Sequence, residues 1–257
     1  MNTSEKLKTI AENVDKVYKA GRSVGGYDNG YEAGQKAEYD AFWDTFQSNG
    51  NRTNYSYGFG GDGWTKELFK PKYDMYIDDA GAMFYRSGIN GDIAEICANA
   101  GVKFDTSKVS NFATFAAWSL ITRFGEIDTT SAWDASLNNS FYSCNNLHTI
   151  DKLILKSTGT QTFVNTLFYG CTALKNITIE GTIGKTISFV DCPLSVASME
   201  SIISHLKNYQ GTSGQYTQTI TFSTACWAAY NEAHPELATG WDNIQGWISM
   251  NLGWNVS

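Results

Sequence analysis

A short aromatic motif that recurs through the middle of the chain constrains the fold more than any other sequence feature. Most copies have a Phe, a small residue or Cys three positions later, and a Leu or Ile two or three positions after that. The copies begin at Phe84, Phe115, Phe141, Phe168 and Phe189, in steps of 31, 26, 27 and 21 residues. A period in the twenties, with one turn and one short strand per unit, is typical of a leucine-rich-repeat solenoid, in which stacked units share one continuous core.

Three of the five cysteines, Cys144, Cys171 and Cys192, occupy the same position of this motif. Stacked units would place their side chains one above another in the interior, as a ladder of small, polarisable groups. His148 lies near Cys144 but has no counterpart in the other copies, so the pattern does not indicate a metal site. The odd number of cysteines and the absence of a CxxC pair also argue against a disulfide scaffold or a structural zinc.

The two most regular copies, Phe141–Leu147 and Phe168–Leu174, share the string Phe-Tyr-x-Cys-x-x-Leu and precede β-prone segments at 150–155 and 177–179. This string resembles the BspA-type leucine-rich repeats of bacterial surface proteins and phage proteins. The resemblance covers about residues 81–194, and the first two copies depart from it, with Ser87 and Trp118 at the cysteine position. It implies an α+β chain built around a short β-rich, BspA-like leucine-rich-repeat solenoid.

A second resemblance concerns the segment before the repeats. The runs 38–44 (EYDAFWD) and 49–53 (NGNRT) are similar to the leaders of repeat proteins encoded in prophages of gut Firmicutes. This resemblance implies a virion location in a phage tail. The first residues contain no continuous apolar run of the signal-peptide type, and no stretch of about 18 apolar residues occurs. We therefore expect synthesis in the bacterial cytoplasm without a signal peptide, and no membrane insertion.

The pattern predicts four parts: an N-terminal amphipathic helix within 1–24, an aromatic- and glycine-rich capping region at 25–80, the solenoid at 81–194 and a C-terminal α/β cap at 195–257. Within the first part, residues 4–20 form a short seam of apolar residues at alternating spacings of three and four: Leu7, Ile10, Val14 and Val17. This seam either packs on its own domain or joins several copies of the chain as a coiled coil. The second interpretation predicts a homo-oligomer.

The aromatic-rich part carries 13 aromatic residues between Tyr27 and Tyr76. They either line a sugar-binding surface or form the core of a small domain with few aliphatic residues, and we favour the core. A helix is expected over about 31–47. In the C-terminal part we expect a helix capped by Ser195 or Ser198, a strand at 218–224, a helix from about Thr224 and a last helix at about 241–251.

Motifs for catalysis are missing from the sequence. None of the three histidines falls in a metal or triad spacing, and no phosphate-binding glycine loop occurs. Neighbouring carboxylates, such as Asp78 with Asp79 or Glu126 with Asp128, do not form the facing pair of a glycosidase. We therefore predict no enzyme activity, no catalytic residue, no cofactor and no metal. The net charge of −7 argues against nucleic acid and anionic membranes as partners.

The remaining candidate is a binding surface. In three copies the residue after the buried Phe is a tyrosine, and stacking would align Tyr85, Tyr142 and Tyr169 into an exposed ridge, with Ala116 and Val190 as breaks. These tyrosines either shield the edges of the units or contact cell-wall glycan. Trp118 and Trp133 are further candidates. An uncharged surface with exposed rings suits a glycan, whereas an obligate protein interface usually shows a larger apolar patch.

Together these features predict a non-enzymatic, tail-associated phage or prophage protein that binds a glycan or protein of the bacterial host surface and contacts other tail proteins. One alternative is a structural virion or baseplate component whose contacts are with proteins alone. Another is a bacterial surface adhesin.

Overall fold

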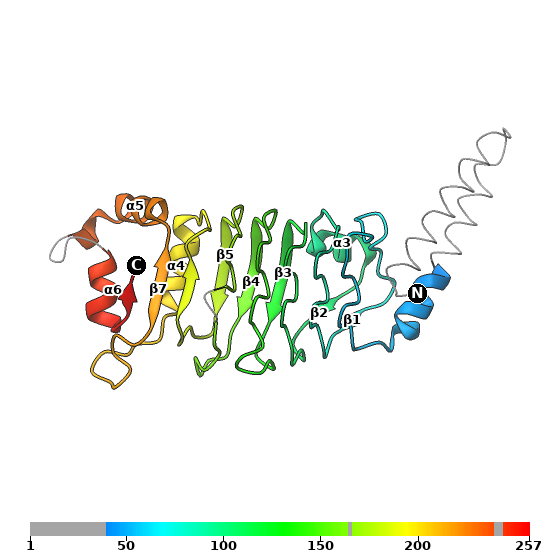
Figure 1. Cartoon of the computed structure of the whole chain (residues 1–257), viewed down its shortest axis with the longest axis horizontal. Helices are drawn as coiled ribbons and strands as arrows, with labels where there is room; N and C mark the ends of the chain where they lie inside the picture. The colour runs from blue at the N-terminus through cyan, green and yellow to red at the C-terminus, as the bar shows by residue number, and fades with distance from the viewer. Residues whose placement is uncertain (1–39, 164–165, 239–243) are drawn as a thin grey trace.

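The protein is elongated, and its strands lie side by side across the long axis (Figure 1). The computed structural model describes residues 40–163, 166–238 and 244–257. In chain order the strands are β1 (Met75–Tyr76), β2 (Phe104–Asp105), β3 (Arg123–Asp128), β4 (Thr149–Ile154), β5 (Asn176–Glu180), β6 (Ile187–Phe189), β7 (Thr219–Phe222) and β8 (Asn255–Val256). Strands β4 and β5 confirm the segments that the sequence predicts at 150–155 and 177–179.

Helices lie between and beyond these strands. Residues 40–46 are helical, followed by the 3₁₀ turn η1 (Ser48–Gly50). The helices that follow are α3 (Ile93–Ala100), α4 (Val196–Ser204), α5 (Thr224–Ala233), the 3₁₀ turn η2 (Pro235–Ala238) and α6 (Ile244–Leu252). Ser195 caps α4 by accepting a hydrogen bond from the Ser198 N–H, and Ser223 caps α5 in the same way. The helices and the strand predicted for the C-terminal part are therefore confirmed.

The strands form three small sheets, with the orders β1-β2, β3-β4-β5 and β6-β7-β8, and every strand pair in them is parallel. Phe124 pairs with Ile150, and Ile150 pairs with Ile177, so one turn of chain separates neighbouring strands of the central sheet. Buried and exposed residues alternate in β5, where Ile177 and Ile179 face the core. One repeat of the sequence is therefore the length of chain that leads from one strand to the strand beside it.

The predicted fold class, an α+β chain built around one leucine-rich-repeat solenoid, is wrong. The structure is a mixed α/β arrangement of separate small parallel sheets and helices. The central sheet ends at β5 because the next contacts come from helix α4, where the hydroxyls of Ser198 and Ser201 accept hydrogen bonds from the N–H groups of Ile177 and Ile179. On the other side, the chain leading into α3 contacts the start of β3 through a single bridge between Asp92 and Arg123.

Phenylalanine rings form a continuous column through the interior. Neighbouring ring centroids are 5.0–5.9 Å apart, and all of the rings are buried: Phe59, Phe84, Phe115, Phe141, Phe168, Phe189 and Phe222. Such offset-stacked and edge-to-face contacts add to the free energy of burying apolar surface. The column joins the whole described length of the molecule into one hydrophobic core, from Trp43 to Trp254.

The predicted cysteine ladder is confirmed. Each thiol lies beside the backbone of the preceding turn: Cys144 Sγ is 3.0 Å from the Ala116 carbonyl oxygen, and Cys171 Sγ is 2.9 Å from that of Phe141. Cys192 Sγ continues the series at 3.7 Å from the Phe168 carbonyl oxygen. Burial raises the pKa of the Cys192 thiol, so this thiol is held protonated.

One copy of the motif is displaced by one residue. The Phe84 N–H bonds to the Phe115 carbonyl, and the Ala116 N–H bonds to the Ser140 carbonyl, so Ala116 rather than Phe115 is equivalent to Phe84 and Phe141. Ser119 therefore occupies the cysteine position, with its hydroxyl 3.8 Å from Cys144 Sγ. The prediction that placed Trp118 at that position is wrong. Phe115 still fills the interior from the neighbouring position.

Both ends of the described body are covered by aromatic side chains. At one end the buried cluster includes Trp43, Phe46, Phe59 and Trp64, which confirms that the aromatic-rich part forms a core. At the other end Trp254 is buried, and its indole N–H donates to the Lys207 carbonyl at 2.7 Å. The predicted helix at 4–20, with Leu7, Ile10, Val14 and Val17, lies outside the described residues. Of the helix predicted at 31–47, residues 40–47 lie within them, and 40–46 are helical.

Candidate binding surface

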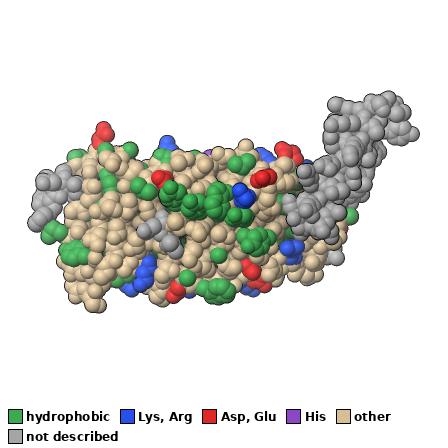
Figure 2. Space-filling view, viewed as in Figure 1, with side chains coloured by type: hydrophobic (Ala, Val, Ile, Leu, Met, Phe, Trp, Pro, Cys, Tyr) green, Lys and Arg blue, Asp and Glu red, His purple; other side chains and the backbone are tan. Residues whose placement is uncertain are grey.

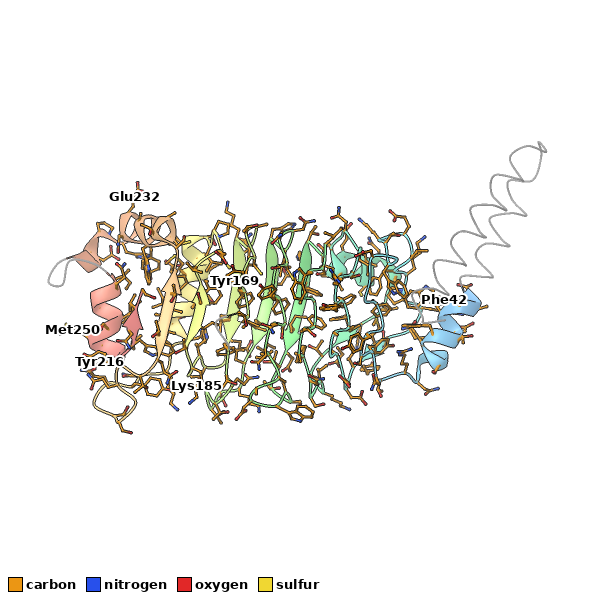
Figure 3. All side chains as sticks on the ribbon, in the orientation of Figure 1. Phe42, Tyr169, Lys185, Tyr216, Glu232 and Met250 are labelled. Carbon is orange, nitrogen blue, oxygen red and sulfur yellow. The ribbon has the colours of Figure 1, made fainter. Side chains whose placement is uncertain are left out.

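Four aromatic rings from successive turns of the chain form one row on the surface. In order they are Tyr85, Trp118, Tyr142 and Tyr169, and we call them the aromatic row. Ring centroids are 5.5 Å apart from Tyr85 to Trp118, 4.8 Å from Trp118 to Tyr142 and 5.2 Å from Tyr142 to Tyr169. Figure 2 shows hydrophobic side chains gathered in a row along the long axis, and Figure 3 labels Tyr169 on the same face.

The row is continuous because Trp118 fills the place that a tyrosine leaves. Ala117 is the residue equivalent to Tyr85 and Tyr142, since the Arg86 N–H bonds to its carbonyl and the Trp118 N–H bonds to the Tyr142 carbonyl. Its methyl group is buried, and the ring of the next residue, Trp118, lies between the two tyrosines. The expectation that Ala116 breaks the row is therefore wrong. Sequence reasoning missed this because it aligned the copy on Phe115.

Trp118 adopts a backbone conformation that is unfavourable for a bulky residue. Its φ is 58°, in the left-handed region, as are those of the equivalent residues Arg86, Ser143 and Gly170. Left-handed backbone costs a non-glycine residue roughly 1–2 kcal/mol. Hydrogen bonds to the turns on both sides fix this conformation, and glycine stands at the equivalent position in the Gly170 turn. A strained position that carries a large exposed ring is a functional candidate.

The rings of the row are not equally exposed. The exposed fractions of Trp118 and Tyr169 are 46% and 49%, whereas Tyr85 and Tyr142 are half-buried. Tyr142 and Tyr169 stack with an interplanar angle of 20°, so each covers one face of the other. Trp118 is tilted by 54° against Tyr142 and lies edge-to-face with Tyr85. The two rings that a ligand meets first are therefore Trp118 and Tyr169, with one lower ring between them.

The phenol hydroxyls of the row are available to a ligand. Those of Tyr85, Tyr142 and Tyr169 have no hydrogen-bond partner within the described part of the chain, and none is among its buried unpaired atoms. Tyrosines elsewhere have partners: the Tyr73 hydroxyl donates to Asp44 at 2.6 Å, and the Tyr209 hydroxyl donates to the Gly184 carbonyl. The row therefore combines apolar ring surface with free donors and acceptors.

Trp133, the remaining predicted candidate, lies apart from the row. Its exposed fraction is 65%, and it makes no ring contact with any residue that the structure describes. Its backbone N–H bonds to the Ser110 carbonyl. The structure thus brings together four of the five predicted binding residues and leaves Trp133 outside.

Three of the four carboxylates singled out in the sequence, Asp79, Glu126 and Asp128, have structural partners. Asp79 Oδ1 accepts a hydrogen bond from the Gly81 N–H at 2.9 Å, Asp128 Oδ1 accepts one from the Thr130 N–H at 2.8 Å, and Glu126 forms an ion pair with Lys152 at 3.3 Å. Across residues 40–163, 166–238 and 244–257, no group of three or more His, Cys, Asp or Glu side chains is placed to hold a metal ion. In the same ranges, no helix has the length and hydropathy needed to cross a membrane.

A polar hollow of about 420 Å³ lies elsewhere on the surface, among the loops that flank β5 and α4. His205 and Lys207 line it together with serine, threonine and asparagine side chains, and no residue of the aromatic row does. The His205 imidazole Nδ1 is 2.7 Å from the Ser201 carbonyl oxygen, so this side chain is engaged by its own helix. The row is therefore a separate feature of the surface.

Comparison with known proteins adds no relative to this picture. No family model, no curated protein and no solved structure matches the chain. The resemblance to BspA-type repeats and to prophage leaders therefore stays a prediction, carried by the motifs quoted above. The geometry of the aromatic row is the stronger basis for a function.

Proposed function

We propose that this chain is a non-enzymatic binding protein of a phage or prophage tail that attaches to a glycan of the bacterial host surface through the aromatic row. The observation that carries the binding role is Trp118, a large exposed ring held on strained backbone at a position that suits glycine. Arg86 and Ser143 share this conformation at the equivalent positions, so among these turns it is the exposed ring that distinguishes Trp118. The location in a tail rests on the similarity of residues 38–53 to prophage leaders.

The chemistry of the row favours a glycan over a protein as its ligand. Sugars offer apolar C–H faces beside hydroxyl groups, and the row offers ring surface beside the phenol hydroxyls of Tyr85, Tyr142 and Tyr169. Charged residues make up only 18% of the chain, so charge pairing contributes little to recognition. The row is also narrow, one ring wide, whereas stable protein interfaces bury a broad patch.

Binding of the labelled full-length protein to a panel of gut Firmicutes cells tests this proposal. We expect strain-selective binding that falls about tenfold or more in Trp118→Gly and in Tyr169→Ala, since each change removes one ring contact. The matched control is Trp133→Ala, which removes an exposed ring outside the row and should bind as the wild type does. Binding that all three variants retain, or binding to no strain, would contradict the proposal and favour a structural tail component.

A further inference from the structure

The polar hollow beside β5 and α4 is a second candidate site, separate from the aromatic row. Three successive turns of the chain form it, with lining residues in the ranges 157–158, 181–182 and 204–208. The second turn is bonded to the third, since the Ile183 N–H donates to the His205 carbonyl and the Lys207 N–H donates to the Ile183 carbonyl, both at 2.8 Å. It also lies against the first, where a Cβ on Gly159 would come within 3.0 Å of Thr182 Cγ2. The volume of 420 Å³ is that of a small-molecule site.

The hollow offers hydrogen-bond donors that the protein itself does not use. The N–H and the hydroxyl of Thr182, which lies in the middle turn, make no hydrogen bond within the described part of the chain. Asn208 Oδ1 accepts a hydrogen bond from the Gln210 N–H at 2.8 Å, so the amide NH₂ of Asn208 is left to donate elsewhere. Together these groups suit a ligand with several acceptor oxygens.

The charge at the hollow is positive. Lys207 comes from the third turn, and its Nζ lies 3.5 Å from the Thr158 carbonyl oxygen of the first turn, so the ammonium group reaches across the middle turn. Lys72 and Lys156 each pair with an aspartate, whereas Lys207 has no carboxylate partner among the described residues. The described residues that line the hollow include no Asp or Glu. An anionic ligand would therefore meet an unpaired ammonium group and no repelling carboxylate.

The imidazole of His205 adds one acceptor to this set of donors. Its Nδ1 lies 2.7 Å from the Ser201 carbonyl oxygen, which can only accept, so the proton of the neutral ring is on Nδ1. Nε2, on the other side of the ring, then carries a lone pair and can accept a hydrogen bond. A ligand that uses both Lys207 and His205 therefore carries an anionic group and a hydroxyl group.

We propose that the polar hollow binds a phosphate ester of a polyol, with the phosphate on Lys207, Thr182 and Asn208 and a ligand hydroxyl donating to His205 Nε2. A phosphate group supplies both the negative charge and enough acceptor oxygens for the unpaired donors. A neutral sugar would leave the ammonium group of Lys207 unpaired, and inorganic phosphate would not reach both ends of the site. Free small molecules and phosphodiester-linked polyol polymers share this chemistry.

Titration calorimetry of the full chain with glycerol 3-phosphate tests this proposal, with inorganic phosphate and glycerol as its separate halves. We expect the ester to bind about tenfold or more tightly than either half, and Lys207→Gln to lose about tenfold or more of that affinity. The matched control is Lys175→Gln, which changes an exposed lysine outside the hollow and should bind as the wild type does. His205→Ala should weaken binding of the ester and leave that of inorganic phosphate unchanged, and His148→Ala should change neither.

A polymer of glycerol phosphate, titrated beside the small ester, distinguishes the two sources of this chemistry. Tighter binding of the polymer would assign the hollow to a surface polymer, and tighter binding of the small ester would assign it to a free compound; both support the proposal. Equal affinity for the ester, inorganic phosphate and sulfate would show a nonspecific anion contact and overturn it. Absence of binding, or an affinity that Lys207→Gln does not change, would overturn it as well. Cell binding through Trp118 and Tyr169 is measured separately, so either proposal can fail alone.

Discussion

The strain at Trp118 predicts an inversion of the usual order of alanine and glycine variants. About half of the ring is buried, so truncation removes roughly 100 Å² of apolar contact, or about 2.5 kcal/mol at 25 cal/mol per Å². Trp118→Ala loses this contact and keeps a Cβ on left-handed backbone. Trp118→Gly loses the same contact but relieves roughly 1–2 kcal/mol of backbone strain. The greater freedom of glycine in the unfolded chain offsets about 0.5–1 kcal/mol of that gain.

The expected result is that Trp118→Gly is more stable than Trp118→Ala by about 1 kcal/mol, and that both are less stable than the wild type by about 1.5–2.5 kcal/mol. Tyr169 provides the matched control, because it has a similar exposed fraction and is not among the described residues with positive φ. Tyr169→Ala should be more stable than Tyr169→Gly by about 0.5–1 kcal/mol.

Chemical denaturation of the four variants measures these differences, and thermal unfolding should follow with about 2–4 °C per kcal/mol for a chain of this size. If Trp118→Ala proved more stable than Trp118→Gly, the backbone at this position would not be strained. The argument that selects Trp118 as a functional residue would then fail.

Four further predictions follow from the fold. Phe141→Ala and Phe168→Ala should each cost about 3–5 kcal/mol in chemical denaturation, and unchanged stability would show that the phenylalanine column is not the core. Burial raises the pKa of the Cys97 thiol from its ordinary value of 9.0 to about 12, so the unfolded chain loses this proton first as pH rises. Stability should therefore fall between pH 9 and 12, by at most about 1.4 kcal/mol per pH unit, and it should fall less in Cys97→Ala. Arg123→Gln should cost about 1 kcal/mol at low salt and less at high salt, because the guanidinium pairs with Asp92 at 2.9 Å and Asp151 at 2.7 Å on a partly exposed surface; a salt-independent loss would refute the electrostatic origin. Light scattering of the full chain should show an oligomer, and a monomer at micromolar concentration would contradict the predicted seam in residues 4–20.

The interior was predictable from the sequence because only inward-facing positions repeat with large apolar side chains. Phe141, Phe168 and the three ladder cysteines stand at fixed offsets, and the structure buries all of them. The cap of α4 at Ser195 was predictable for a local reason, since a serine before an apolar stripe satisfies the first N–H groups of a helix. Such signals depend on one residue and its near neighbours.

The displaced copy was not predictable from the pattern. The turn of chain from Phe84 to its equivalent Ala116 contains α3, which takes up the extra residues and changes the register by one. Phe115 still lies in the column, 5.5 Å from Phe84 and 5.9 Å from Phe141, so a search for large apolar residues finds it in place of the alanine. The phenylalanine ring thus fills the same part of the interior, although it comes from a different backbone position of the turn.

The end of the central sheet depends on contacts that no local pattern reports. A third turn of the same kind after β5 would continue the sheet, but the segment that follows β6 forms α4 and satisfies the edge of β5 through Ser198 and Ser201. Serines on a helix are ordinary in sequence, and their role as acceptors for a neighbouring strand requires the tertiary arrangement. This explains why the fold class was wrong although β4 and β5 were predicted.

The same arrangement makes the aromatic row rigid. Its rings are fixed by the main-chain hydrogen bonds that hold the turns together and by their contacts with one another. Binding of a ligand would therefore cost little conformational entropy of the protein. Affinity then increases with the number of rings that a ligand reaches at once. Under the proposed function, a ligand must therefore fit a surface that does not rearrange to meet it.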